Sequence, residues 1–162
     1  MRCSVYEGFL RYRSLRKESS AHLPPMLLLD HTPRLSPGEA ASLTEKVYGL
    51  AVTATPLPSE RDQNFLLENE AKEKFVLKIA NALEERALLE AQNEALAHIA
   101  RELSFCPRVI PTIAGAEIAQ ISAPAGMHNF VRLLNYLPGT PLAKIEFHSS
   151  QILRDLGRRL AQ

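Results

Sequence analysis

Three short segments with strand character stand directly before one long helical segment, and this order restricts the possible folds more than any other feature. Residues 51–57 are rich in Val and Thr, and residues 63–68 follow a polar turn. Residues 74–80 alternate between two faces, as the side chains of a strand do. Residues 83–103 then carry apolar side chains three and four positions apart, which predicts an amphipathic helix. Together these segments predict an antiparallel sheet with a long helix packed on it.

A short helix is predicted ahead of the first strand. Ser36, Pro37 and Glu39 have the spacing of a capping box with proline in the first turn, and Gly49 is a natural end. Residues 1–34 mix basic, aromatic and serine residues without periodicity, and we predict a loosely ordered leader or the product of an upstream start codon. A targeting peptide is the alternative, but the segment contains two glutamates and has no clear cleavage site.

The second half of the chain predicts more strands and a final helix. Residues 109–114 and 116–121 have the pattern of a hairpin that turns at Gly115, and residues 128–134 form a further strand. A serine at 149–150 can cap a last helix that runs to the end of the sequence. The predicted fold class is α+β, with about five mainly antiparallel strands.

Composition excludes several classes of function. The 162 residues carry 19 basic and 18 acidic side chains, a net charge of +1, so no basic excess points to nucleic acid or a membrane surface. No apolar run approaches the ~20 residues of a membrane helix. The two cysteines, Cys3 and Cys106, and the five scattered histidines have no metal-ligand spacing. We expect Cys106 to be a buried free thiol, which fits a reducing, cytoplasmic location.

A lysine in the middle of the third strand is the first candidate for chemistry. Lys78 lies within Phe-Val-Leu-Lys-Ile, and lysine is rarely buried without a partner. Kinases place a lysine on such a strand to hold the phosphates of ATP. The alternative, a solvated lysine on a half-exposed sheet, is equally compatible with the strand alone.

The long helix is expected to supply a partner for this lysine. Gln92 shares a predicted apolar face with Leu89, Leu96, Ile99 and Leu103. Kinases use an acidic residue there. Two other glutamates of this helix, at 90 and 94, face outward on a helical wheel, whereas the glutamate at 85 returns to nearly the same face. The lysine partner is therefore Gln92 or Glu85, unless the glutamine is simply satisfied by the backbone at the core edge.

Two loops complete the candidate site. The turn at 58–65 contains no glycine, yet Ser59, the backbone amides and Arg61 could contact phosphate; a simple polar hairpin is the alternative. The connector at 134–142 runs from an apolar strand into Pro138-Gly139 and suits a hinge whose backbone reads an adenine edge.

In combination these segments resemble the aminoglycoside phosphotransferase superfamily, most of all its hydroxylysine kinase and homoserine kinase-like branch. The resemblance covers about residues 35–162 and rests on the turn at 57–65, the lysine strand at 75–81, the helix at 88–99 and the connector at 137–142. Similar modules precede class III aminotransferases in multidomain proteins. The resemblance implies a kinase-like N-terminal lobe.

The family pattern also implies roles within an ATP site. Lys78 would bind the phosphates, Val76 would roof the adenine, and Gln92 would stand where many relatives have a carboxylate. The turn would close over the phosphates, and the connector would guard the rear of the pocket and form the hinge. The residues from these two loops are Ser59, Arg61, Leu134, Asn135, Tyr136 and Leu137.

The residues that catalyse transfer in the family are not found in this sequence. The family uses a His-Gly-Asp loop and a later aspartate for the base and for magnesium, whereas the only aspartates here are Asp30, Asp62 and Asp155. Asp155 follows an arginine but lacks the preceding histidine, so we expect a helix-surface residue. We therefore predict no turnover by this chain alone.

These expectations give a domain division and two functional hypotheses. The division is a leader at 1–34, the N-lobe at 35–137, and a hinge exit with the first helix of a missing C-lobe at 138–162. The first hypothesis is the ATP-binding lobe of a small-molecule phosphotransferase, with ATP and a C-terminal lobe, in cis or in trans, as partners. The alternative is a non-catalytic nucleotide-binding or interaction module completed by a partner or by downstream domains such as an aminotransferase.

Overall fold

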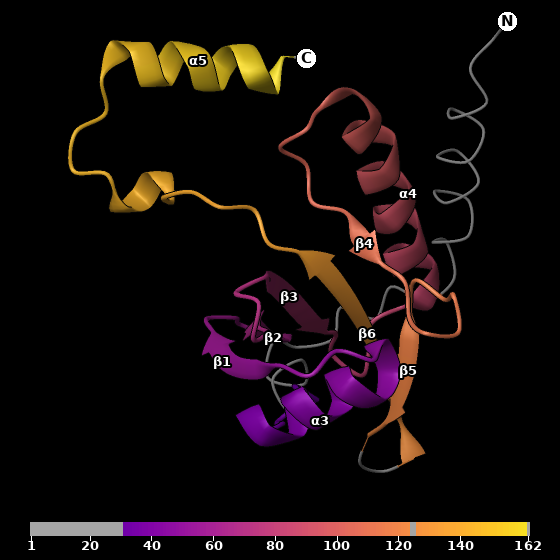
Figure 1. The fold of residues 1–162 in the computed structure, drawn as a ribbon. Coiled ribbons are helices and arrows are strands. Elements are labelled where there is room, and N and C mark those ends of the chain that lie inside the picture. The colour runs from indigo at the N-terminus through magenta and orange to yellow at the C-terminus, as the bar shows by residue number, and fades with distance from the viewer. Residues whose placement is uncertain (1–30, 124–125, 162) are drawn as a thin grey trace, which may run out of the picture.

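The computed structural model of the protein describes residues 31–123 and 126–161, so most of the predicted leader lies outside the described residues. Six strands, three α-helices and a short 3-10 helix follow one another along these residues (Figure 1). In chain order they are α3 Pro37–Tyr48, β1 Thr53–Leu57, β2 Gln63–Glu68, β3 Lys74–Ile79, α4 Arg86–Glu102, β4 Val109–Ile110, β5 Ala119–Ser122, β6 His128–Asn135, η2 Leu142–Lys144 and α5 Ser150–Leu160.

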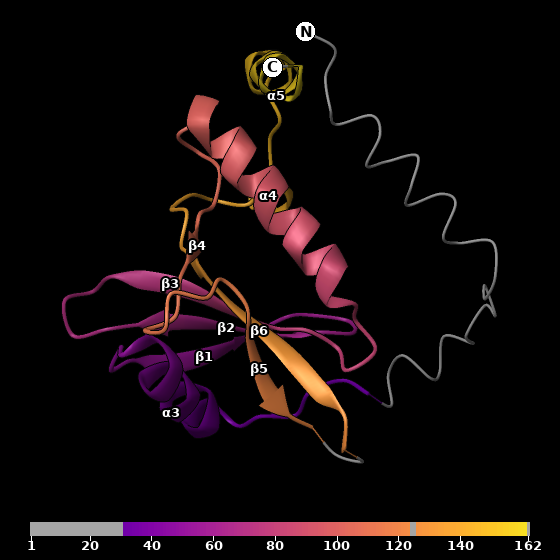
Figure 2. The ribbon, with the colours of Figure 1, turned by 90° about the vertical axis from the view of Figure 1, so that its right-hand side faces the viewer.

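All six strands belong to one antiparallel sheet with the order β1-β2-β3-β6-β4, and β5 also pairs with β6. The strand β6 comes last in the sequence but lies beside β3, so the long helix α4 is part of the crossover between them. Figures 1 and 2 show α3 and α4 on opposite faces of this sheet. The predicted α+β arrangement is confirmed.

The predicted hairpin around Gly115 is wrong. A tight turn is present, because Gly115 has φ of 80° and its N–H donates to the carbonyl of Thr112 at 2.8 Å. However, β4 and β5 pair with β6 and not with each other. Eight residues of β6 offer an edge long enough for two short strands in succession, so the turn carries the chain along that edge.

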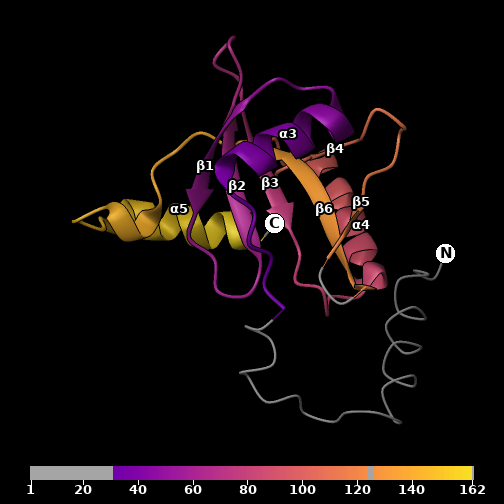
Figure 3. The ribbon, with the colours of Figure 1, turned by 90° about the horizontal axis from the view of Figure 1, so that it is seen from below.

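The helix α3 covers the first face of the sheet. Its predicted capping box is present: Ser36 Oγ accepts from the N–H of Glu39 at 3.2 Å, and Glu39 accepts from the N–H of Ser36 at 2.7 Å. Gly49 ends the helix with φ of 69°. The helix α3 lies across the strands of the sheet (Figure 3). The core beneath it consists of buried side chains from three strands with two from the helix, namely Ala40, Tyr48, Phe65, Leu67, Leu77, Ile79, Val131 and Leu133.

The helix α4 lies on the second face, but it is rotated from the predicted orientation. Its buried positions are Leu89, Asn93 and Ala100, whereas Gln92 and Ile99 are exposed. Successive positions four and seven apart still make one face. The predicted face is therefore wrong by about one residue, because the buried polar group that faces the sheet is Asn93.

The last helix, α5, is set apart from the sheet, near the carboxyl end of α4 (Figures 1 and 2). Ser149 caps it by accepting from the N–H of Ile152 at 3.2 Å. Arg159 lies 5.3 Å from the ring centre of Phe105, in the segment after α4. Three apolar side chains of α5 are exposed, at 36% for Ile152, 52% for Leu153 and 40% for Leu156.

Candidate functional site

A row of three polar side chains crosses the sheet on the face toward α4. Lys78 of β3 is paired in register with Asn64 of β2 on one side and with Arg132 of β6 on the other. Their strand neighbours Phe65, Leu77 and Val131 belong to the α3 core, so alternation turns the row to the opposite face. Two cations thus occupy adjacent positions across β3 and β6.

Lys78 is half-buried, and within the described part of the chain its ammonium makes no hydrogen bond or ion pair. Next to it, Asn64 has a buried Oδ1 without a hydrogen-bond partner among the described residues. A buried carbonyl oxygen left unpaired costs about 1–3 kcal/mol. This end of the row therefore combines a cation with an acceptor that a donor group can still satisfy.

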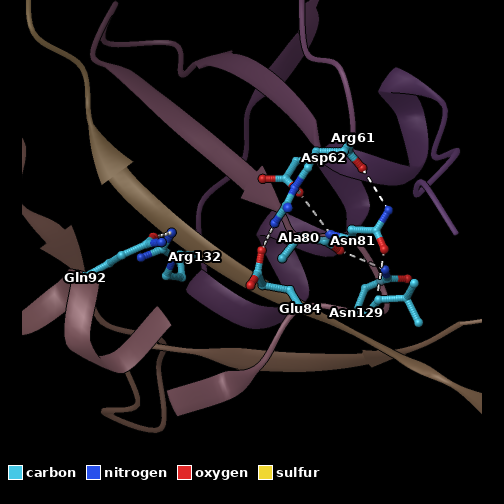
Figure 4. Close-up of polar contacts among 9 residues, drawn as sticks. Arg61, Asp62, Ala80, Asn81, Glu84, Gln92, Asn129 and Arg132 are labelled. Carbon is cyan, nitrogen blue, oxygen red and sulfur yellow. Dashed lines mark hydrogen bonds and ion pairs between the residues drawn. The ribbon is translucent and has the colours of Figure 1, made fainter. Parts of the chain in front are cut away.

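Arg132 is only 6% exposed and joins β6 to α4 (Figure 4). Its Nη1 donates to Asn93 Oδ1 at 2.8 Å and to the Leu89 carbonyl at 3.4 Å, and its Nη2 donates to Gln92 Oε1 at 2.8 Å. Burial lowers the pKa of Arg132 below its ordinary value, and the negative charge of Asp62 opposes that shift. Its hydrogen-bond partners on α4 are all neutral, so the charge of Arg132 is held without a contacting carboxylate from the described residues.

The predicted partners of Lys78 are placed elsewhere. Gln92 accepts from Arg132, one strand away from the lysine. Glu85 is the N-cap residue of α4 and is exposed, without a capping hydrogen bond from its side chain. The contact with Arg132 was missed because the spacing along the helix gave Gln92 a face but no specific partner. Glu90 and Glu94 face outward, as predicted.

The turn between β1 and β2 is tied to the segment that links β3 to α4. Asn81 is buried, its side-chain amide donates to the carbonyl of Arg61 at 3.1 Å, and its backbone N–H donates to Asp62 Oδ1 at 3.1 Å. Arg61 also forms an ion pair with Glu84 (Figure 4). These contacts fix the turn beside the lysine strand. Ser59 is exposed at the turn, and the Arg61 side chain is 47% exposed.

The connector leaves the sheet directly behind the row of polar residues. Val76 pairs in register with Leu134, and both lie on the face toward α4, two residues along their strands from Lys78 and Arg132. The N–H of Asn135 donates to the Arg108 carbonyl at 3.1 Å, and that of Tyr136 to the Lys74 carbonyl at 3.2 Å. The next N–H, of Leu137, has no protein acceptor among the described residues.

Sequence reasoning did not single out three residues of the site: Asn64, Asn93 and Arg132. For Arg132 a signal existed, because a charge within the apolar run Phe-Val-Arg-Leu-Leu is as unusual as Lys78 in its strand. Asn93 is adjacent to Gln92, which was predicted as the polar residue facing the sheet, and only the rotation of α4 decides which of the two is buried. Asn64 lies at the end of the turn predicted to close over the phosphates, but nothing in the sequence distinguished it from the other polar residues of that turn.

The described residues contain neither a candidate metal cluster nor a helix that could span a membrane. Within residues 31–123 and 126–161, no group of three or more His, Cys, Asp or Glu side chains could hold a metal ion. In the same ranges, no helix has the length and apolarity needed to cross a bilayer. Cys106 is a buried free thiol, as predicted. Asp155 lies on α5, where it pairs with Arg158.

The fold defines a class of protein: an antiparallel sheet with a lysine on its third strand, on the face toward a long helix, is the fold of the N-terminal lobe of kinase-like phosphotransferases. The profile of the Phosphotransferase enzyme family matches residues 53–162, and the chain belongs to this family. Hydroxylysine kinase of Danio rerio is 33% identical over 135 residues, which is 80% of this chain and 38% of the relative. Hydroxylysine kinase of Xenopus laevis is 33% identical over 145 residues, which is 83% of this chain and 38% of the relative.

Solved structures show the same fold. A microcompartment-associated aminopropanol kinase superposes with a TM-score of 0.58 at 17% identity, over 74% of this chain and 37% of that one. The amicoumacin kinase hAmiN, in complex with AMP-PNP, Ca²⁺ and Ami, superposes with a TM-score of 0.57 at 12% identity, over 67% of this chain and 33% of that one. The chain thus spans little more than a third of the length of the relatives that it matches.

Proposed function

We propose that this chain binds ATP and supplies the nucleotide-binding lobe of a small-molecule phosphotransferase. The single observation that carries the proposal is the position of Lys78: a half-buried ammonium on the face toward α4, beside Arg132 and without a carboxylate partner in the described part of the chain. Two adjacent cations repel each other, and a polyphosphate would convert that repulsion into attraction.

The surroundings of Lys78 fit both ends of a nucleotide, the phosphates and the base. Toward the phosphates, the turn with Ser59 is anchored by Asn81 next to the lysine strand. Toward the base, Val76 and Leu134 provide an apolar surface, and the N–H of Leu137 is a donor that an adenine ring nitrogen can accept from. The orphan Asn64 Oδ1 can accept from the Lys78 ammonium and orient it.

The acceptor substrate would be a small metabolite with a hydroxyl group. The support for this is the family and its relatives, which include two hydroxylysine kinases. A hydroxyl acceptor attacks the γ-phosphoryl group in line, and cations at the nucleotide phosphates stabilise the charge that develops. The residues of this chain would contribute that electrostatic stabilisation and the position of the nucleotide.

The test is calorimetric titration of ATP into the full chain, into Lys78→Ala and into Lys46→Ala. Lys46 lies on the exposed side of α3, beyond the opposite face of the sheet, and is the matched control for the loss of one positive charge. We expect Lys78→Ala to weaken ATP binding at least tenfold and Lys46→Ala to leave it unchanged. Equal binding by all three proteins, or none by the wild type, would overturn the proposal.

A second candidate function is an interaction module, and the exposed apolar side chains of α5 favour it. Ile152, Leu153 and Leu156 give this helix an uncovered apolar face, which is typical of a surface that packs against another folded unit. A chain that binds no ATP but associates through α5 would fit this second function and not the first. The same titration therefore distinguishes the two.

A further inference from the structure

The contact between Arg132 and α4 determines more than the position of the helix. Arginine has donors only, so the atom of Gln92 that faces Nη2 at 2.8 Å is the carbonyl oxygen, Oε1. The amide nitrogen of Gln92, with two N–H donors, is consequently turned away from Arg132. Gln92 is exposed, so these donors are accessible to a ligand.

The orientation of Arg132 is in turn fixed by Asn93. The side chain of Asn93 is buried and makes two hydrogen bonds: Oδ1 accepts from Arg132 at 2.8 Å, and Nδ2 donates to Glu117 Oε2 at 3.1 Å. A carboxylate can only accept, which leaves Oδ1 for Arg132. The guanidinium is therefore held at two nitrogens, by Asn93 and Gln92, with the Leu89 carbonyl as a further acceptor.

We infer that Arg132 is a positioning residue that orients the amide of Gln92, so that α4 presents N–H donors to the nucleotide phosphates instead of an acceptor to Lys78. This inference rests on the proposed function, and it assigns Gln92 the opposite polarity from a carboxylate at the same place. The Lys78 ammonium and the Gln92 amide would then both offer N–H donors to the bound anion, and the buried Arg132 would add its positive charge.

Replacing Gln92 with glutamate distinguishes the two polarities. A carboxylate would bind Arg132 more strongly but would bring a negative charge to the phosphates. We expect Gln92→Glu to weaken ATP binding about tenfold, as for one unfavourable charge at a partly solvated site, and to leave adenosine binding unchanged. Gln120→Glu, which adds the same charge at an exposed position on β5, is the matched control and should not alter either affinity. If Gln92 instead accepts from Lys78, glutamate will preserve or tighten ATP binding, and that result would overturn the inference.

The positioning role of Arg132 requires a double-mutant cycle. Gln92→Met should weaken ATP binding several-fold in the wild-type background and should have no further effect in the Arg132→Met background, because the amide is then no longer oriented. If Arg132 only stabilises the fold, Gln92→Met will weaken ATP binding equally in the wild-type and Arg132→Met backgrounds. In that case Arg132→Met will also weaken adenosine binding. Independent, multiplicative effects on ATP affinity would therefore refute the positioning role.

The wild type, Gln92→Met, Arg132→Met and the double variant also give a measurement that needs no ligand. A double-mutant cycle built from their unfolding equilibrium constants should show at least threefold coupling between positions 92 and 132. The reason is that either substitution alone already removes the hydrogen bond between Arg132 and Gln92. Absence of this coupling overturns the contact itself, whatever the protein binds. If the coupling is present but the wild type binds no ATP, the proposed function fails, and with it the donor role of Gln92, while the contact with Arg132 stands.

Discussion

Tyr48 should make the stability of this protein fall steeply above pH 10. Its phenol is buried in the α3 core, 7% exposed, and its hydroxyl donates to the carbonyl of Val131 at 3.4 Å. Burial raises the pKa of Tyr48 from 10.0 to about 12, because the charged phenolate would lose its hydration in the core. The unfolded chain therefore ionises before the folded protein does.

The sign and the size follow from linkage. The folded-state pKa is raised, so the contribution of Tyr48 is fully present below pH 10 and is lost as the pH rises toward 12. At pH 11 the loss is about 1.4 kcal/mol, since each pKa unit corresponds to about 1.36 kcal/mol. At neutral pH, Tyr48→Phe should cost no more than about 1 kcal/mol, because it removes a single long hydrogen bond.

The assay is urea unfolding of the wild type and Tyr48→Phe at pH 8, 10 and 11. Lysines and other tyrosines titrate in both proteins, so the difference between the two free energies of unfolding isolates Tyr48. We expect the difference to shift by about 1.4 kcal/mol in favour of Tyr48→Phe at pH 11, relative to pH 8. Parallel pH profiles, or a tyrosinate absorbance titration in which the substitution removes a group that ionises near pH 10, would refute the reasoning.

Three further predictions concern the contacts of Asn81 with the β1–β2 turn, the core and α5. Asn81→Ala should destabilise the protein by about 2 kcal/mol in urea unfolding, because it removes two part-buried hydrogen bonds, one from its side-chain amide to the Arg61 carbonyl of the β1–β2 turn and one from the Leu83 N–H to its Oδ1; a cost below about 0.5 kcal/mol would contradict this role of Asn81. Leu77→Ala should cost about 2–5 kcal/mol, whereas Ile113→Ala, at a side chain 73% exposed, should change stability by less than about 0.5 kcal/mol. Leu153→Lys with Leu156→Lys should reduce binding of an apolar dye and leave the unfolding midpoint unchanged; a drop in that midpoint would show that α5 packs against the lobe.

Local patterns in the sequence were sufficient for most of the elements. Ser36, Glu39 and Gly49 define the ends of α3 through contacts within a few residues, and the structure has both caps where they were predicted. The strand β2 begins and ends at the predicted residues, and β3, which alternation indicated, does so within one residue. Such features depend on neighbours in the chain, so spacing alone identifies them.

Pairings between distant segments were beyond the reach of the sequence. Nothing in the spacing of residues 109–121 indicates that β4 and β5 share an edge of β6, because that depends on the length of a strand that comes later in the chain. The rotation of α4 is also a tertiary matter. Gln92 and Asn93 are adjacent, and the position of Arg132 on β6 decides which one is buried.

By itself the sequence determined the succession of strands and helices, the lysine at the centre of β3, and the family to which the chain belongs. The tertiary structure alone decided what surrounds that lysine. It placed Asn64 and Arg132 beside Lys78 across three strands, and it paired Gln92 with the arginine and not with the lysine. The physical reason is that alternation along a strand shows which residues share a face, whereas the register between strands, which follows from packing of the whole core, shows which residues meet.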